Sequence, residues 1–320
     1  MALTTLELCA GAGGQAIGLE AAGYSHRAVV EIEPNFCETL RTNRPQWTVI
    51  NEDINKLDGT KFEGIDLLAA GLPCPPFSVA GKQLGEKDER NLFPAALRII
   101  EQAKPRAVMI ENVRGFLDAV FLDYREGLRD RLYELGYITA WRLLNASDFG
   151  VPQLRPRVVI VALKREYFDN FDWPQIASHN PPTVGETLHK MMASRGWKGA
   201  NRWKTKADDI APTIVGGSKK HGGPDLGPTR AKRAWASLGV DGLGIADQPP
   251  SADEPVDLMP RLTVPMVALI QGFPSDWQFH GRKTAAYRQV GNAFPPPVAK
   301  AVALQIKKAL SAKRLIRVAA

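Results

Sequence analysis

The chain has few cysteines and no long apolar run. Its three cysteines, Cys9, Cys37 and Cys74, show no CxxC or Cys/His spacing and leave one unpaired in any disulfide scheme. We therefore expect neither a metal site nor a disulfide scaffold. No stretch approaches the ~18 apolar residues of a membrane span, and no basic segment precedes an apolar one near Met1. These absences predict a cytoplasmic protein without a signal peptide or a membrane anchor.

The composition is that of a globular protein with an excess of positive charge. A chain of 320 residues, 44% of them hydrophobic, can bury the core of one large domain or of two modest ones. The net charge of +7 favours a polyanionic partner such as nucleic acid. The net charge alone does not say where on the surface that partner binds.

Apolar runs and amphipathic segments alternate along the first half of the chain. This alternation predicts a parallel, doubly wound α/β sheet. The expected strands are residues 3–9, 28–31, 48–50, 66–70, 107–110 and 158–162, and the expected helices are residues 13–22, 34–43, 92–102 and 124–135.

The pattern changes between about residues 173 and 260, where glycine and proline clusters replace clear periodicity. Such a texture predicts a second, smaller, loop-rich domain. Regular spacing returns at residues 264–270, and we expect the helix at residues 298–310 to pack back on the first domain. The resulting prediction is a catalytic domain of residues 1–172 and 288–320, and a second domain with a hinge at residues 173–287.

A thiol and a carboxyl follow two of the expected strands. Cys74 lies between two prolines after the strand at residues 66–70, and Glu111 ends the next apolar run. Because the carboxyl ends of neighbouring parallel strands meet at one crevice, we expect both side chains in one site. A stiff loop suits a positioned nucleophile, and a glutamate in an apolar crevice suits a proton donor. The alternatives are a small buried cysteine and a salt bridge from Glu111 to Arg114 or Arg155.

A glycine-rich turn at residues 7–14 follows the first expected strand. Its glycines would let a cofactor approach the backbone, and Glu31, about 20 residues further on, stands where a carboxylate binds ribose hydroxyls. Asp53, after the third strand, could contact an adenine amine or cap a helix. Glycines that only allow tight packing are the other interpretation of the turn.

Basic residues gather in two further places. Arg155 and Arg157 alternate on an extended segment, where they could hold a base oxygen or a phosphate, or form a solvated edge. Residues 195–233 carry ten basic side chains against three acidic ones, together with Trp197 and Trp203. This interval is typical of a surface that tracks phosphates, although charged loops are commonly just solvated.

In this order, the motifs resemble those of the C5-cytosine DNA methyltransferase family along nearly the whole chain outside about residues 166–260. The resemblance implies a class I S-adenosylmethionine-dependent methyltransferase fold, α/β and Rossmann-like, with a smaller loop-rich target-recognition domain. The matching segments are residues 7–14, Glu31, Asp53, Pro73 with Cys74, and residues 111–113, 153–157, 261–274 and 289–293.

The same resemblance implies S-adenosylmethionine as methyl donor, S-adenosylhomocysteine as product and a flipped cytosine of duplex DNA as acceptor. By position, Cys74 attacks cytosine C6 and Glu111 engages the N3 edge, while Arg157 holds O2 and Arg155 supports the pocket. The implied cofactor-binding residues are Glu7, Leu8, Cys9, Ala10, Gly11, Gly13, Gly14, Glu31, Ile32, Asp53, Ile54, Pro73, Asn292 and Ala293. The implied DNA-binding residues are Ser78, Lys82, Gln83, Arg90, Thr213, Lys219, Lys220 and Arg230.

Three positions depart from the family pattern. Cys9 stands where the family usually has Phe, Ile32 where an aromatic residue often lies against adenine, and the segment at residues 88–93 is one residue short. We expect a differently packed adenine site and unchanged cysteine chemistry. Residues 79–91 are expected to form the mobile loop that closes over DNA.

Rival functions differ in the motifs that they require. A nicotinamide-dependent oxidoreductase would share the glycine-rich turn but needs no thiol and acid at two strand ends. A methyltransferase acting on exocyclic amines would carry an Asp/Asn/Ser-Pro-Pro-Tyr or Phe motif. A tRNA-methylating branch of the family retains the same catalytic parts, and a non-catalytic DNA-binding member would not need Cys74 and Glu111. The expected partners are double-stranded DNA and, functionally, a restriction endonuclease of a restriction-modification system, with the enzyme itself a monomer.

Overall fold

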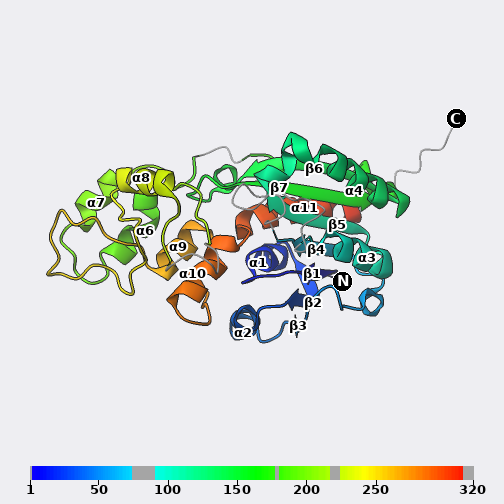
Figure 1. Ribbon diagram of the computed structural model, residues 1–320, viewed down its shortest axis with the longest axis horizontal. Coiled ribbons are helices and arrows are strands. Elements are labelled where there is room, and N and C mark those ends of the chain that lie inside the picture. The colour runs from blue at the N-terminus through cyan, green and yellow to red at the C-terminus, as the bar shows by residue number, and fades with distance from the viewer. Residues whose placement is uncertain (1, 74–90, 177–179, 217–223, 313–320) are drawn as a thin grey trace.

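A single seven-stranded sheet forms the centre of the molecule (Figure 1). The structure is a computed structural model that describes residues 2–73, 91–176, 180–216 and 224–312. The strand order is β3-β2-β1-β4-β5-β7-β6. The strands are β1 (Leu3–Leu8), β2 (Tyr24–Glu31), β3 (Val49–Asn51), β4 (Leu67–Gly71), β5 (Ala107–Val113), β6 (Tyr137–Asn145) and β7 (Pro156–Lys164).

The strand directions correct the expectation of an all-parallel sheet. The first five strands are parallel, whereas β7 runs antiparallel to both β5 and β6. Strand β6, absent from the expected set, precedes β7 in the chain, and residues 146–155, which include η5, connect the two as antiparallel neighbours. Because β7 begins at Pro156, Arg157 lies inside a strand rather than before one.

Helices cover both faces of the sheet, as a doubly wound fold requires. Leu67 and Ala69 of β4 lie in an apolar cluster with α1 and α11. Leu68 and Ala70 face the other way, toward α3 and α4. The helices of this part are α1 (Gly14–Ala21), α2 (Pro34–Asn43), α3 (Phe93–Ala103), α4 (Leu122–Glu134), α5 (Arg165–Phe168) and α11 (Pro296–Ser311), with 3-10 turns η1 (Gly59–Phe62), η3 (Arg114–Leu117), η4 (Ala119–Phe121) and η5 (Ala146–Phe149).

Helix α11 returns to the first half of the chain, which confirms the expected packing of the last helix. A Cβ atom on Gly18 of α1 would lie 2.5 Å from the Ala299 Cβ of α11, so the glycine allows the two helices to touch. Prolines at the first positions of α2, α3 and α11 mark where these helices begin, because the missing N–H is not needed there.

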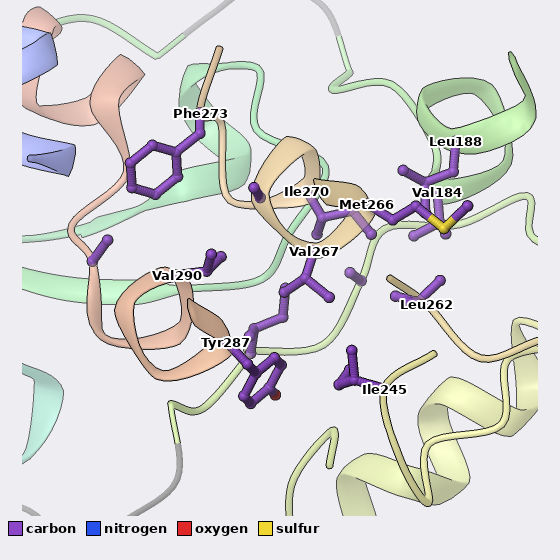
Figure 2. Packing of buried hydrophobic residues seen from close by; sticks show 14 of the residues in the cluster. Val184, Leu188, Ile245, Leu262, Met266, Val267, Ile270, Phe273, Tyr287 and Val290 are labelled. Carbon is purple, nitrogen blue, oxygen red and sulfur yellow. The ribbon is translucent and has the colours of Figure 1, made fainter. Parts of the chain in front are cut away.

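The chain between α5 and α11 forms a loop-rich part to one side of the sheet (Figure 1). Its core surrounds α9, where Met266 lies beside Val184 and Leu188 of α6, and Val267 points toward Tyr287 of α10 (Figure 2). The same apolar cluster includes side chains of the first half of the chain: Ala10, Ile17, Val29, Leu40 and Trp47. The helices of this part are α6 (Val184–Met192), α7 (Ala200–Lys206), α8 (Thr229–Ser237), α9 (Val264–Ile270) and α10 (Lys283–Asn292).

Two tryptophans expected on a nucleic-acid surface are instead core residues. Trp197 and Trp203 are only 3% and 4% exposed. Their indole N–H groups donate hydrogen bonds to the carbonyl oxygens of Pro255 and Gly239, at 2.9 and 3.0 Å. A buried indole with a satisfied N–H stabilises a domain through its large apolar area, so this prediction of surface aromatics is wrong.

Within the described residues, no helix combines the length and apolar character that crossing a membrane requires.

Candidate functional site

At the carboxyl edge of the sheet, the two segments that we expect to carry catalytic residues lie side by side. Gly71, the last residue of β4, is paired in register with Glu111 of β5. Pro73 follows two residues later, so the chain leaves β4 at the level of the glutamate. Cys74 itself, with Ser78, Lys82, Gln83, Arg90, Lys219 and Lys220, lies outside the described residues, as does most of the loop expected at residues 79–91.

Glu111 forms a buried ion pair with Arg157. The Arg157 Nε atom lies 2.7 Å from Glu111 Oε1, and the two side chains are 12% and 7% exposed. Burial raises the pKa of Glu111 above its ordinary value, and the positive charges of Arg157 and Arg155 partly offset that rise. The salt bridge weighed as an alternative therefore exists, but its partner is Arg157 rather than Arg114 or Arg155.

Arg155 holds backbone rather than a carboxylate. Its guanidinium donates hydrogen bonds to the carbonyl oxygens of Ile214, Gly291 and Ala293, at 2.5, 2.8 and 3.0 Å. The residue is 1% exposed, so the alternative of a solvated edge is wrong for it. Arg155 thereby ties β7 to the segment before residue 217 and to the end of α10.

Two buried glutamines extend this junction. Gln153 accepts a hydrogen bond from the backbone N–H of Ile214 at 2.9 Å and donates to Gln271 Oε1 at 2.7 Å. Gln271 in turn donates to the Ala293 carbonyl oxygen at 2.6 Å. Sequence reasoning gave neither glutamine a role of its own, although each lies in a segment that matches the family pattern, residues 153–157 and 261–274.

Two backbone segments, one at Gly216 and one at Gly291, pass very close to each other at this junction. A Cβ atom on Gly291 would lie 2.4 Å from the Gly216 Cα atom, and one on Gly216 would lie 2.1 Å from Asn292 Oδ1. Only glycine at both positions allows the two segments to pass so closely. Thr213, half-buried just before them, donates its hydroxyl hydrogen bond to the Leu154 carbonyl oxygen.

The glycine-rich turn leaves open space beside the end of β1. Cys9, Gly11 and Gly13 have φ values of 53°, 56° and 88°, and nothing lies within 4 Å of the position that a Cβ on Gly11 would occupy. The buried Glu31 carboxylate accepts hydrogen bonds from the backbone N–H groups of Gly11 and Glu33, at 2.7 and 2.9 Å. Each oxygen of Glu31 therefore retains acceptor capacity toward a hydroxyl group.

A second carboxylate beneath the turn has no partner. Both oxygens of Glu7 are buried and make no normal hydrogen bond within the described residues. Burial raises the pKa of Glu7 well above its ordinary value; the nearby backbone N–H of Ala16 lowers it in part, and Glu31 raises it further. Burial likewise raises the pKa of the Cys9 thiol.

The remaining expected cofactor residues border the same turn. Ile32 is 58% exposed directly after Glu31, whereas Ile54 is buried. Asp53 Oδ1 accepts hydrogen bonds from the backbone and side-chain N–H groups of Asn55, so Asp53 caps a turn and not a helix. Leu8 and Ala10 are buried at the end of β1, and the packing of Gly14 against Phe294 O and Ala293 brings the end of α10 to the turn.

These features fit a charged nucleoside cofactor. Exposed apolar surface at Ile32, acceptor capacity at Glu31 and open space at Gly11 suit an adenine, a ribose and a close approach to backbone. Burial disfavours the ionised form of Glu7, and a positive charge bound beside it would stabilise that form, so the site favours a positively charged ligand. Within the described residues, no group of His, Cys, Asp or Glu is placed to hold a metal ion.

The sheet order with antiparallel β7, the glycine-rich turn after β1 and the carboxylate that ends β2 together define a class I S-adenosylmethionine-dependent methyltransferase. The family model for C-5 cytosine-specific DNA methylase matches residues 3–308. The chain belongs to this family and is a DNA cytosine-C5 methyltransferase that uses S-adenosylmethionine, which confirms the resemblance seen in the sequence.

Two curated relatives match almost the whole chain. Type II methyltransferase M.NaeI from Lentzea aerocolonigenes is 56% identical over 313 residues, which are 97% of this chain and 76% of that protein. Type II methyltransferase M.NgoMIV from Neisseria gonorrhoeae is 54% identical over 313 residues, 97% of this chain and 99% of that protein.

Solved structures show the same fold at low identity. Entamoeba histolytica methyltransferase EhMeth aligns with a TM-score of 0.69 at 14% identity, covering 98% of this chain and 100% of that one. A mutant of Spodoptera frugiperda DNMT2 aligns with a TM-score of 0.63 at 20% identity, covering 97% and 100%.

Proposed function

We propose that this enzyme methylates C5 of a flipped cytosine within a specific duplex sequence, through a transient bond between the Cys74 sulfur and cytosine C6. The observation that supports this most is the buried Glu111–Arg157 pair, in register with the strand end that leads to Cys74. A thiol and an acid at one crevice are what this addition needs.

The proposed chemistry divides among three side chains. The Cys74 thiolate adds to C6. Because burial raises the pKa of Glu111, its carboxylate can take up a proton from solvent as the base enters and donate that proton to N3 as charge arrives there. Arg157 holds Glu111 in place and binds the cytosine O2. When bound, S-adenosylmethionine would supply the methyl group that C5 takes up, with S-adenosylhomocysteine as the product. Transfer of the C5 proton to a water molecule would then expel the Cys74 sulfur as thiolate, and return of the N3 proton to Glu111 would restore the neutral aromatic ring.

Arg155 acts indirectly in this scheme. Its three bonds to backbone carbonyl groups fix the segment carrying Thr213 and the end of α10 against β7. Because catalysis depends on geometry within a fraction of an ångström, such a support affects rate without touching the base.

The cofactor would lie across the carboxyl ends of β1 and β2. Glu31 binds the ribose hydroxyls with its free acceptor positions, and Asp53 accepts from the adenine amine. Ile32 covers one face of the ring, and Glu7 faces the positive charge of the methionine moiety. Backbone and short side chains complete the site: Leu8, Cys9, Ala10, Gly11, Gly13, Gly14, Ile54, Pro73, Asn292 and Ala293.

DNA would bind between the sheet and the loop-rich part. We assign residues 173–287 to target recognition and hinge, and residues 1–172 with 288–320 to catalysis. We assign Ser78 and Thr213 to phosphates beside the flipped nucleotide, and further basic and polar side chains to the rest of the footprint: Lys82, Gln83, Arg90, Lys219, Lys220 and Arg230. The enzyme acts as a monomer and protects sites that a restriction endonuclease of matching specificity would cut.

A covalent-trapping experiment tests the chemistry. Duplex DNA of random sequence, methylated by the enzyme and read by bisulfite sequencing, gives the recognition site. Duplexes with 5-fluorocytosine at the target position should then form a denaturant-stable adduct with the wild type in the presence of S-adenosylmethionine. Cys74→Ser should form no adduct and no product, whereas Cys37→Ser, which changes a buried cysteine of α2, should still form it. Methylation by Cys74→Ser would overturn the assignment.

The cofactor assignment has a separate test. Glu31→Gln should weaken S-adenosylmethionine binding roughly 10-fold or more in equilibrium dialysis, because one carboxylate that serves two hydroxyl groups is replaced by an amide with one acceptor. Unchanged affinity would remove Glu31 from the site.

A further inference from the structure

Helix α8 is anchored by its inner face and leaves its outer face uncovered. Trp235 is fully buried, and the Lys232 ammonium lies 2.6 Å from Asp225 Oδ2. The exposed positions lie one, four, five, seven and eight residues after the first of them, so they share one side of the helix. These positions are Thr229, Arg230, Arg233, Ala234, Ala236 and Ser237.

The segment that leads into α8 is tied to the catalytic junction. A Cβ atom on Gly227 would lie 3.0 Å from Val215 Cγ2, and Val215 follows the Ile214 carbonyl group that Arg155 binds. The Tyr287 hydroxyl of α10 donates to the Asp225 carbonyl oxygen at 2.7 Å. The first turn of α8 is therefore joined by short, rigid contacts to the residues that border the cytosine pocket.

The outer face of α8 carries unpaired positive charge. The side chains of Arg230 and Arg233 make no ion pair or hydrogen bond with any described residue, and the helix contains no acidic residue. Lys232 differs, because Asp225 already neutralises it. Arginines that no described residue neutralises are available to DNA.

The shape of this face suits base edges better than a phosphate track. The major groove admits an α-helix, and a forked guanidinium bonds both N7 and O6 of guanine. Arg230 and Arg233 are separated by a rise of about 4.5 Å along the axis, close to one base-pair step. The small side chains of Ala234 and Ser237 leave room for the bases beside them.

We propose that α8 is the helix that reads the target sequence, with Arg230 and Arg233 each bound to a guanine in the major groove beside the flipped cytosine. The inference rests on the proposed DNA complex and adds which side chains select the sequence. Arg230, expected only as a general DNA contact, becomes a determinant of specificity, and Arg233 joins it.

Helix α7 supplies the matched control. It also exposes basic side chains, among them Arg202, but it lies farther from the sheet than α8 along the long axis of the molecule (Figure 1). A change there should leave sequence choice unaltered.

The test uses full-length Arg230→Lys, Arg233→Lys and Arg202→Lys variants, which keep their charge. Competition binding compares the affinity for the sequence that the wild type prefers with the affinity for duplexes in which one base pair is changed. For each α8 variant, this ratio should fall roughly 10- to 100-fold at one position of the sequence. Bisulfite sequencing should show methylation spreading to sequences changed at that position. Arg202→Lys should match the wild type.

The binding ratio does not depend on the methyl-transfer chemistry, so it remains readable even if the proposed role of Cys74 is wrong. An unchanged ratio in both α8 variants would overturn the inference. A second outcome would also overturn it: Arg230→Ala and Arg233→Ala lose affinity equally for all sequences and keep the same preferred sequence, and the slope of log affinity against log salt concentration falls in magnitude by about 1. That result would identify phosphate contacts.

Discussion

The Glu111 carboxylate and the Arg157 guanidinium lie diagonally across β5 and β7, with Oε1 and Nε 2.7 Å apart. Glu111 is in register with Val159, two residues beyond Arg157, so both side chains project from the same face of the antiparallel pair. Neither charge is stable alone in this buried position, because an isolated ion in an apolar site is strongly disfavoured. The carboxyl group that serves as the acid is thus held in place before a cytosine enters the site.

Replacing Glu111 should therefore impair both chemistry and folding. Glu111→Gln removes the acid, so methyl transfer in a single turnover should fall by at least about 100-fold. It also leaves Arg157 without its counter-charge, which should cost about 3 kcal/mol of unfolding free energy in urea.

The control is Glu101→Gln, which breaks the exposed pair with Arg131 at 2.9 Å. That change should cost less than about 1 kcal/mol and spare activity, because exposed pairs contribute little. Full activity in Glu111→Gln would contradict its role as the acid.

Arg155→Lys should loosen the junction between the sheet and the loop-rich part. A lysine cannot reproduce bonds to three carbonyl groups, and each charged hydrogen bond contributes about 1.5–3 kcal/mol, so a loss of about 3 kcal/mol is expected. Amide hydrogen exchange at Ile214 and Ala293 should rise.

Arg98 offers a comparison, because it also donates to three backbone carbonyl groups, those of Ile54, Asn55 and Leu57. Arg98→Lys should lower stability without faster exchange at Ile214. Equal exchange there in both variants would show that Arg155 does not hold the junction locally.

Gly291→Ala should destabilise the protein although alanine favours helices. Its Cβ would meet the Gly216 backbone at 2.4 Å, and relieving such a clash costs about 1–3 kcal/mol. Gly127→Ala, in α4 with nothing within 4 Å of the new Cβ, should instead stabilise by about 0.5–1 kcal/mol. If the two backbones pass this closely, the unfolding temperature should fall in Gly291→Ala and rise in Gly127→Ala. A rise in both variants would contradict the close approach.

His26 makes stability fall in acid. Burial lowers its pKa from the ordinary 6.5 to about 4, only partly offset by its bond to the Ala16 carbonyl oxygen. Between these values the unfolded chain binds the proton and the folded chain does not, so the stabilising contribution is full above pH 6.5 and is lost as pH falls through 4. The loss amounts to about 3 kcal/mol. His26→Gln should flatten this part of the urea stability profile, and exposed His280→Gln should not.

Several elements of the fold could be read from the sequence because their signals are local. The helix at residues 34–43 has the predicted bounds, since Pro34 fits only the first turn. Strand β6 escaped notice because it is an edge strand with Arg142 and Leu143 exposed, which blurs its alternation. The direction of β7 was not predictable from periodicity, which is the same for parallel and antiparallel strands.

For the site, too, the sequence predicts some features and not others. The proximity of the β4 exit and Glu111 follows from strand order alone, and the sequence predicted it. The pairing of Glu111 with Arg157 depends on the reversed direction of β7, so sequence reasoning named Arg114 and Arg155 instead. Trp197 and Trp203 misled because lysines and arginines surround them in sequence. Their burial depends on how the loop that carries Trp197 and the face of α7 that carries Trp203 pack against the domain.

The apolar cluster that joins Leu40 and Trp47 to Met266 and Val267 limits how specificity can be engineered in this enzyme. A recognition segment cut out as an independent module would expose the underside that normally rests on α2, and would aggregate rather than fold. Chimeras with a relative should therefore exchange the outward residues of α8 one at a time and leave α9 and α10 untouched. The enzyme would then gain new sequence preferences while the apolar cluster shared by its two parts stays intact.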